Sequence, residues 1–190
     1  MLTLSKLEQF DAQLEELRLA SPRRDLTAFV RAALDTAQDK EEEEFFLSTL
    51  AHEYAYSGRF DEAESTIRKQ LEIAPDSPVA WVQLASHFLY NTRELKKALS
   101  AAEIAVEHAE AQGGFVRYTH GVRIRIALEM KKYEIVEASL VKLVEYTPEQ
   151  PEIGLEGDFI NRIPKGKVNK EIVDRYKERL AWESGQLRTV

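Results

Sequence analysis

The side chains that could do chemistry in this sequence include four histidines, and one of them begins a pattern found in zinc proteases. His52 is followed by Glu53, but the fourth residue after His52 is Tyr56, where a zinc-binding helix needs a second histidine. A di-iron helical bundle needs a glutamate three residues before a histidine, and none of the four histidines has one. The sequence therefore predicts no metal site and no cofactor.

Nucleophilic and phosphate-binding motifs cannot be recognised either. The chain has no cysteine, which excludes disulfides, thiolate nucleophiles and thiolate metal ligands. It contains no Gly-rich phosphate loop and no Gly-x-Ser-x-Gly elbow, and Gly113-Gly114 is typical of a helix end. Carboxylates are numerous, but they fall on polar helix faces. We predict no catalytic residue and a protein that is not an enzyme; an enzyme whose site lacks a recognisable motif is the alternative.

Charge is distributed unevenly along the chain. Residues 1–77 carry 17 acidic and 9 basic side chains, residues 78–150 carry 9 of each, and residues 151–190 carry 7 acidic and 8 basic. A chain this acidic is a poor candidate for nucleic-acid binding, which depends on neutralising phosphates. The run Glu41–Glu44 predicts a solvated first helical turn, or alternatively a docking patch for a basic partner. A small basic cluster predicts a solvated loop, or alternatively an anion contact: Arg162, Lys165, Lys167 and Lys170.

The sequence contains neither a secretory signal pattern at its first residues nor eighteen consecutive apolar residues. We therefore expect a cytoplasmic protein without a membrane partner.

Hydrophobic periodicity predicts helices throughout. Hydrophobic residues make up 44% of the chain and charged residues 31%, while Gly and Pro are scarce at 8 and 6. Ser5 and Glu8 form a capping-box pattern ahead of a first helix, and Ser21-Pro22 predicts the start of a second. These two segments predict an antiparallel helix pair over residues 5–38. Asp39 and Glu42 repeat the capping-box pattern ahead of a third helix.

An internal repeat follows. Residues 44–77 and 78–111 share a pattern at an offset of 34 residues, with one additional residue in the turn of the second unit. A third, degenerate unit is expected over residues 117–150, with Tyr133 at the turn and Pro148 at the end, although Ile124 and Val136 stand where small residues are expected. The shared positions of the first unit are Leu47, Leu50, Ala51, Tyr54, Phe60 and Ala63; those of the second are Trp81, Leu84, Ala85, Phe88, Leu95 and Ala98.

This pattern resembles the tetratricopeptide repeat (TPR) family of helical repeat proteins. The resemblance is strong for residues 44–77, apart from Gln70 in place of a small residue, and good for residues 78–111. It implies an all-α fold in which antiparallel helix pairs form a right-handed superhelical stack. We expect a single domain over residues 1–183, with a mostly irregular segment at 149–167 and a capping helix at 168–183. Residues 184–190 are expected to form a frayed tail.

The resemblance also implies a binding groove, because in this family the first helix of each pair lines the concave surface and partner peptides bind there. The basic and amide side chains with which some members hold a chaperone carboxylate are absent here. The alternative is that the groove is filled from within, by the N-terminal pair or by residues 149–167. The two clear units would present Phe45, Ser48, His52, Ala55 and Tyr56 and then Val79, Val82, Ser86, Leu89 and Tyr90; the third would present Tyr118, Gly121, Arg125, Leu128 and Glu129.

The function that the resemblance implies is a non-enzymatic protein–protein interaction module, or scaffold, that binds a partner peptide or helix in its concave groove. The alternative is a dedicated chaperone or inhibitory partner that masks a basic or amphipathic protein through the acidic N-terminal half. The partner in either case is a protein or peptide, not a nucleic acid or a membrane, and its identity cannot be inferred from the sequence.

Overall fold

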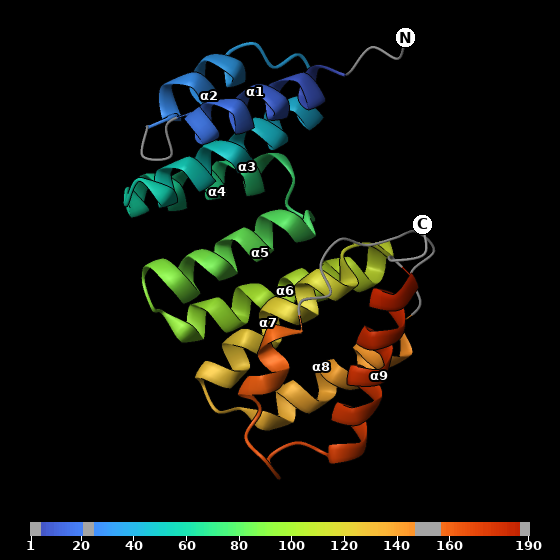
Figure 1. Cartoon of the computed structure of the whole chain (residues 1–190). Coiled ribbons are helices and arrows are strands. Elements are labelled where there is room, and N and C mark those ends of the chain that lie inside the picture. The colour runs from blue at the N-terminus through green and yellow to red at the C-terminus, as the bar shows by residue number, and fades with distance from the viewer. Residues whose placement is uncertain (1–4, 21–24, 147–156, 187–190) are drawn as a thin grey trace. The chain divides into compact units, whose positions relative to one another are not determined.

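The fold is all-α, as predicted. A computed structural model describes residues 5–20, 25–146 and 157–186, and these ranges contain helices and connecting loops but no strand (Figure 1). No helix within them is both long enough and apolar enough to cross a membrane. The contacts of the chain divide it into two compact units, Met1–Ile73 and Ala74–Val190. The boundary lies close to the junction between the first two predicted repeats, and the prediction of a single domain stays a prediction.

The described residues of the first unit form four helices, and two of these helices have the predicted caps. At the first helix, Ser5 N donates to Glu8 Oε2 at 2.7 Å and Glu8 N donates to Ser5 Oγ at 3.3 Å, which completes the capping box. At the third, Glu42 N donates to Asp39 Oδ1 at 2.9 Å. The helices are α1 (Lys6–Ala20), α2 (Thr27–Leu34), α3 (Lys40–Tyr56) and α4 (Phe60–Ile73).

The predicted start of α2 at Ser21-Pro22 is wrong. Residues 21–24 lie outside the described part of the chain, but Asp25 and Leu26 are not helical and α2 begins at Thr27. The carboxylate of Asp25 accepts a hydrogen bond from Thr27 N at 2.9 Å and so caps the first turn. Leu26, which is the N-cap residue, makes no side-chain cap bond, so the carboxylate of Asp25 is the side-chain partner of the first helical N–H.

Polar contacts fix the directions of α1, α2 and α3. The ammonium group of Lys6 donates to Thr36 O at 2.8 Å, which places the start of α1 beside the end of α2. The same group is 2.6 Å from Glu42 Oε2, and Arg18 is 2.6 Å from Glu53 Oε1. Lys6 and Glu42 lie at the starts of α1 and α3, and Arg18 and Glu53 lie near their ends, so these two helices run in the same direction. Because the start of α1 lies beside the end of α2, α2 runs opposite to α1.

The core of this unit is aromatic. The ring of Phe10 stacks on Phe29 with centroids 5.3 Å apart and meets Phe45 and Phe46 edge-on at 6.0 and 5.0 Å. Apolar residues of α1, α2, α3 and α4 complete this cluster, so α1 joins the core of the unit through Phe10 and Leu14.

The second unit contains the remaining elements. Ser77 caps its first helix by accepting from Ala80 N at 3.3 Å, with Pro78 in the first turn. Gly113, at φ 70°, ends its second helix, as the sequence predicts. The elements are α5 (Pro78–Ser86), the π-helical turn η1 (His87–Asn91), α6 (Leu95–Gln112), α7 (Val116–Glu129), α8 (Tyr133–Glu145), the 3₁₀ turn η2 (Asp158–Arg162) and α9 (Lys170–Gln186).

Three helix pairs are closed by the same three-residue turn, whose middle residue is left-handed. That residue is Gly58 in α3–α4, Arg93 in the pair formed by α5, η1 and α6, and Lys131 in α7–α8, with φ values of 75°, 60° and 56°. The next backbone N–H donates back into the first helix each time, to Tyr54 O at 2.8 Å, Phe88 O at 2.8 Å and Ala127 O at 2.9 Å. The turns thus align Tyr54, Phe88 and Ala127 as equivalent positions.

The additional residue of the second repeat lies in a helix and not in the turn where it was predicted. The turn Thr92–Glu94 is as short as Ser57–Arg59, whereas the preceding helix widens into η1, where Thr92 N donates to His87 O five residues back. A single inserted residue is accommodated in this way when the hydrogen-bond ladder shifts from i−4 to i−5.

The third pair is a true helix pair whose packing is rearranged. Ile124 and Val136 are fully buried where the first pair has Ala51 and Ala63. Ala127 stands where the first pair has Tyr54, so bulk added at one position is removed one helical turn away on the same face. This exchange explains why the repeat pattern is degenerate in sequence while the helix pair persists.

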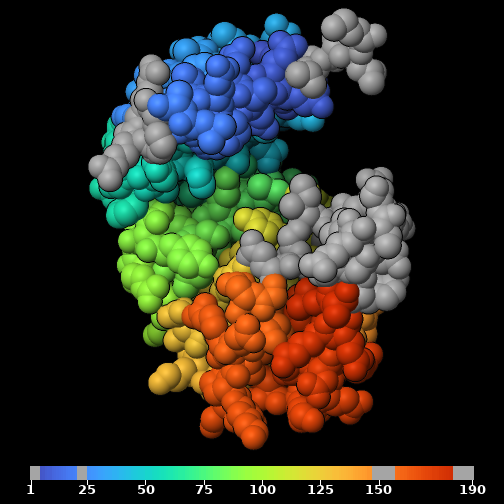
Figure 2. All heavy atoms as spheres, in the orientation of Figure 1, coloured from blue at the N-terminus to red at the C-terminus, as the bar shows by residue number. Residues whose placement is uncertain are grey.

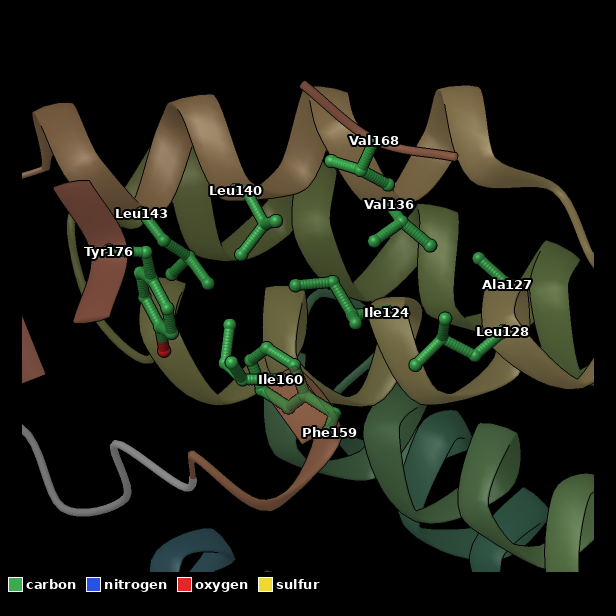
Figure 3. Packing of buried hydrophobic residues seen from close by; sticks show 10 residues of the cluster. All are labelled: Ile124, Ala127, Leu128, Val136, Leu140, Leu143, Phe159, Ile160, Val168 and Tyr176. Atoms are coloured by element: carbon green, nitrogen blue, oxygen red, sulfur yellow. The ribbon is translucent and has the colours of Figure 1, made fainter. Parts of the chain in front are cut away.

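The C-terminal helix α9 packs against α8, as a capping helix should. Tyr176 of α9 stacks on Phe159 of η2 at 5.8 Å, and both enter a cluster with Leu140 and Leu143 of α8 (Figure 3). The predicted helical turn near Phe159 is present as η2. However, α9 continues to Gln186, so the tail predicted from Ser184 is helical for its first three residues. Pro148 lies outside the described residues.

Candidate protein-binding surfaces

In the second unit, the predicted groove face of α7 is covered by the chain's own segment η2. Arg125 Nη2 donates to Asp158 Oδ1 at 3.1 Å, and its guanidinium lies 6.0 Å from the centroid of the Phe159 ring. Leu128 packs in the same cluster as Phe159 and Ile160 (Figure 3). A β-carbon at Gly121 would lie 4.0 Å from Arg125 Nη1, so this small residue leaves room beside the guanidinium.

Ion pairs strengthen this cover at its far end. Glu129 pairs with Arg162 of η2 and with Arg93 of the preceding turn, the latter at 3.3 Å. In Figure 2 the orange spheres of the η2 segment lie beside the red spheres of α9. The part of the third predicted face around Arg125, Leu128 and Glu129 is therefore filled by residues of the 149–167 segment, which is the alternative raised from the sequence, whereas Tyr118 stays 37% exposed.

The predicted residues of the second repeat separate into buried and exposed ones. Val82 and Leu89 are 0% and 1% exposed, so they belong to the core and cannot contact a partner, contrary to expectation. Val79 and Ser86 are half-buried, and Tyr90 is 58% exposed. Helix α5 contacts both α6 and α7, and packing on two sides leaves only a narrow strip of α5 open.

A second exposed tyrosine of this unit comes from α7. Tyr118 is partly exposed, and burial raises its pKa; Arg125 opposes this effect, while Tyr90 adds to it. Both tyrosines are exposed amphipathic rings of the second unit.

In the first unit, the predicted residues lie along one face of α3. Phe45 packs against Phe10 of α1, so at this end the N-terminal pair fills the groove. Ala55 also packs on that cluster, and Ser48 is half-buried. His52 is exposed and Tyr56 is 65% exposed. Only the last two turns of α3 therefore keep the expected groove face open.

Glu53, which follows His52 in the protease-like pattern, is structural. Its carboxylate is buried and accepts from Arg18 Nη2 at 2.6 Å, so it holds α1 on α3. Within the described residues no group of three or more histidines and carboxylates is arranged to hold a metal ion.

His120 is a core histidine. Its side chain is buried in α7, with Nε2 3.2 Å from Glu110 Oε1 and with Nδ1 lacking a hydrogen-bond partner in the described part of the chain. Burial lowers its pKa and the nearby Glu110 opposes the shift only in part. The ring therefore favours its neutral form and a packing role.

A surface that sequence reasoning missed is a groove of about 910 Å³ in the first unit, on a different face of α3. It lies between α2 and α4, and Leu47, Leu50 and Tyr54 of α3 form its floor. Leu34 and Ala37 line one wall and Ile73 the other. The signal for it is the length of α2, which has 8 residues beside the 17 of α3. The sequence predicted a helix pair over residues 5–38, whereas α2 ends at Leu34.

The rim of this groove is charged. Asp35, Glu43 and Glu72 line it, and none of them is in an ion pair with a described residue. Arg31 lines it too, but its guanidinium donates to the phenol oxygen of Tyr54 at 2.6 Å. Lys69 is the remaining cation of the lining.

The Glu41–Glu44 run is therefore neither a uniform docking patch nor a simple solvated turn. Glu42 pairs with Lys6, and hydrogen bonds from Lys6 and from Gln38 N lower its pKa. Glu44 accepts from the buried Gln70 at 3.4 Å. Glu43 belongs to the groove rim, and Glu41 is exposed.

The basic cluster of the C-terminal region is mostly engaged with the chain itself. Arg162 pairs with Glu129, Lys167 lies 6.0 Å from the Tyr133 ring centroid, and Lys170 is 3.5 Å from Asp174. Lys165 is exposed. These contacts favour the solvated loop over an anion site.

Comparison of the chain with protein-family models, with curated proteins and with solved structures finds no match.

Proposed function

We propose that the chain is a helical repeat protein of the TPR kind, a non-enzymatic module that holds a segment of a partner protein. The recurrent left-handed turn at Gly58, Arg93 and Lys131 supports the repeat assignment, because it closes three helix pairs in the same way. The right-handed superhelix and the concave groove are part of this proposal.

The observation that carries the proposal is the pair Tyr56 and Tyr90. They lie 34 residues apart, each two residues after the aligned Tyr54 and Phe88, and each exposes more than half of its side chain. A tyrosine offers a large apolar area at low entropic cost together with a polar tip, and it is among the residues enriched at protein interfaces. Two such rings at equivalent positions are best explained as anchors for a partner.

The local geometry suits capture without rearrangement. Tyr90 belongs to the π-helical turn η1, a kind of distortion that often accompanies functional sites. Tyr118 of α7 adds a third exposed ring, while half-buried Ser86 supplies a hydroxyl on the same repeat as Tyr90. A surface that is already formed loses little entropy on binding, which favours affinity.

A specific observation favours a second candidate, in which the first unit masks a basic or amphipathic protein. Met1–Ile73 contains sixteen acidic and nine basic residues, whereas Ala74–Val190 contains seventeen of each. The whole net charge of −7 therefore belongs to the first unit. The negative electrostatic potential of a unit with this charge accelerates association with a basic partner and makes the affinity depend on salt concentration.

Site-specific crosslinking tests the first candidate. A photo-reactive phenylalanine introduced at Tyr56 or Tyr90 should crosslink the same partner protein in lysate of the source cell. The controls are Leu19 and Phe115, which are 81% and 51% exposed but lie outside the predicted groove residues. Equal crosslinking from all four positions, or none from the tyrosines, would reject these anchors. Binding that collapses as salt rises, with both tyrosines dispensable, would favour the masking candidate.

A further inference from the structure

We propose that the groove of the first unit, lined by α2, α3 and α4, binds a basic amphipathic helix of another protein. This deepens the masking candidate and names its site and the kind of partner it fits. The groove uses a face of α3 that does not include His52 or Tyr56, so its test does not depend on the tyrosine anchors.

The groove is open because α2 ends early. Helix α2 stops at Leu34, and the chain then turns through Asp35 and Ala37 to reach α3 at Lys40. On the face of α3 that α1 does not cover, the first turns consequently have α4 on one side and only this short connection on the other. Leu47 lies at the floor of the uncovered stretch, and Leu34, Ala37 and Ile73 remain partly exposed around it.

The shape and lining fit a helix. Both α2 and α4 pack on α3, so a segment laid between them would lie along α3. Packed helices lie about 8–10 Å apart, and they contact a groove through apolar residues at i, i+3, i+4 and i+7. Leu47, Leu50 and Tyr54 form the floor but are at most 5% exposed, so the apolar stripe of the partner would contact mainly the partly exposed Leu34, Ala37 and Ile73.

The charges specify a basic partner. Asp35, Glu43 and Glu72 stand on the rim without an ion pair to any residue in the described ranges. Of the two cations in the lining, Arg31 is committed to Tyr54, which leaves Lys69 against three carboxylates. The unit as a whole also carries the net negative charge of the chain. A helix with an apolar stripe flanked by Lys or Arg would complement both features, and an acidic helix would be repelled.

A synthetic peptide tests the fit directly. The probe is a labelled amphipathic peptide of about 18 residues, with leucine at i, i+3, i+4 and i+7 and lysine elsewhere, long enough to form a helix on a surface. Its counterpart has glutamate at every lysine position. Fluorescence anisotropy with the full chain should show saturable binding of the lysine peptide alone, and amide chemical shifts should change around Leu34, Leu47 and Ile73.

Two pairs of variants separate the groove from general attraction. Ala37→Trp should fill the groove and weaken binding at least about 10-fold, whereas Ala28→Trp, on an exposed site of α2 outside the groove, should not. A rim triple variant should also weaken binding roughly 10-fold, and a control triple of equal charge change should weaken it little. The rim variant is Asp35→Asn, Glu43→Gln and Glu72→Gln; its control is Glu16→Gln, Glu103→Gln and Glu107→Gln.

Three results would overturn the proposal: no binding of the lysine peptide, equal binding of both peptides, or binding that Ala37→Trp leaves intact. Tyr56→Ala and Tyr90→Ala should not change the affinity of this peptide. A negative crosslinking result at positions 56 and 90 would therefore reject the tyrosine anchors, and a negative peptide result would reject the groove. Each result leaves the other proposal standing.

Discussion

Replacing Ala85 by isoleucine and Phe88 by alanine should transfer to the second helix pair the packing that the third pair already has. Ala85 and Phe88 are buried one helical turn apart, and the turn geometry aligns them with Ile124 and Ala127 of α7. Ala85→Ile alone should cost about 1–3 kcal/mol of unfolding free energy through overpacking. Phe88→Ala alone should cost about 3–5 kcal/mol through the cavity it leaves.

The double variant should be more stable than the sum of the single changes predicts. The added branch at position 85 fills part of the space that Phe88 vacates, so the summed cost of about 4–8 kcal/mol should fall by about 1–2 kcal/mol. Urea unfolding followed by tryptophan fluorescence measures this, because both tryptophans, Trp81 and Trp182, belong to the second unit.

A control cycle pairs Ala85→Ile with Leu143→Ala in α8, which packs on α7 and α9. These two changes should add within about 0.5 kcal/mol. If Ala85→Ile and Phe88→Ala also add within that limit, the alignment of the second and third pairs is wrong, and so is the explanation of the degenerate repeat.

Three further predictions concern stability. Lys131→Gly should stabilise the second unit by up to about 1 kcal/mol in urea unfolding, because it relieves a left-handed residue, and Gly58→Ala should destabilise the first unit by a similar amount; opposite signs would refute the turn assignment. The second unit should lose stability as the pH falls below about 6.5, because burial lowers the pKa of His120 in the folded state and protonation favours the unfolded chain; His120→Gln should flatten this dependence, and an unchanged slope would contradict it. Phe159→Ala should cost about 3–5 kcal/mol and increase hydrogen exchange in α7, since η2 covers that helix; unchanged exchange would show that η2 does not protect it.

Much of the fold could be predicted from the sequence, because local rules determine it. Capping residues such as Ser5 and Asp39, helix-ending Gly113 and the small residues of the repeats each act within one or two turns of the chain. The start of α2 was missed because its N-cap residue, Leu26, has no capping side chain that the sequence could reveal. The π-helical turn was missed because one additional residue between Phe88 and Leu95 shifts the later repeat positions by one, whether it lies in the helix or in the turn.

The candidate surfaces were harder to predict, because exposure depends on which elements cover a face. Periodicity places Val82 and Tyr90 on one face of the second repeat, yet α6 and α7 flank α5 and leave only Tyr90 open. The cover of α7 by η2 depends on Arg125 and Asp158, residues 33 positions apart, and no motif links them. The groove of the first unit results from a helix that ends early, and no cluster of functional side chains marks it.

The most direct test of the proposed function is the affinity of the crosslinked partner for four forms of the full chain, measured by calorimetry. Tyr56→Ala and Tyr90→Ala should each weaken binding by about 2 kcal/mol, roughly 30-fold, while Leu19→Ala should leave it unchanged. All variants should keep the wild-type circular dichroism, since these side chains are exposed. Wild-type affinity in both tyrosine variants would contradict the claim that this helical repeat chain holds its partner through equivalent tyrosines of successive repeats.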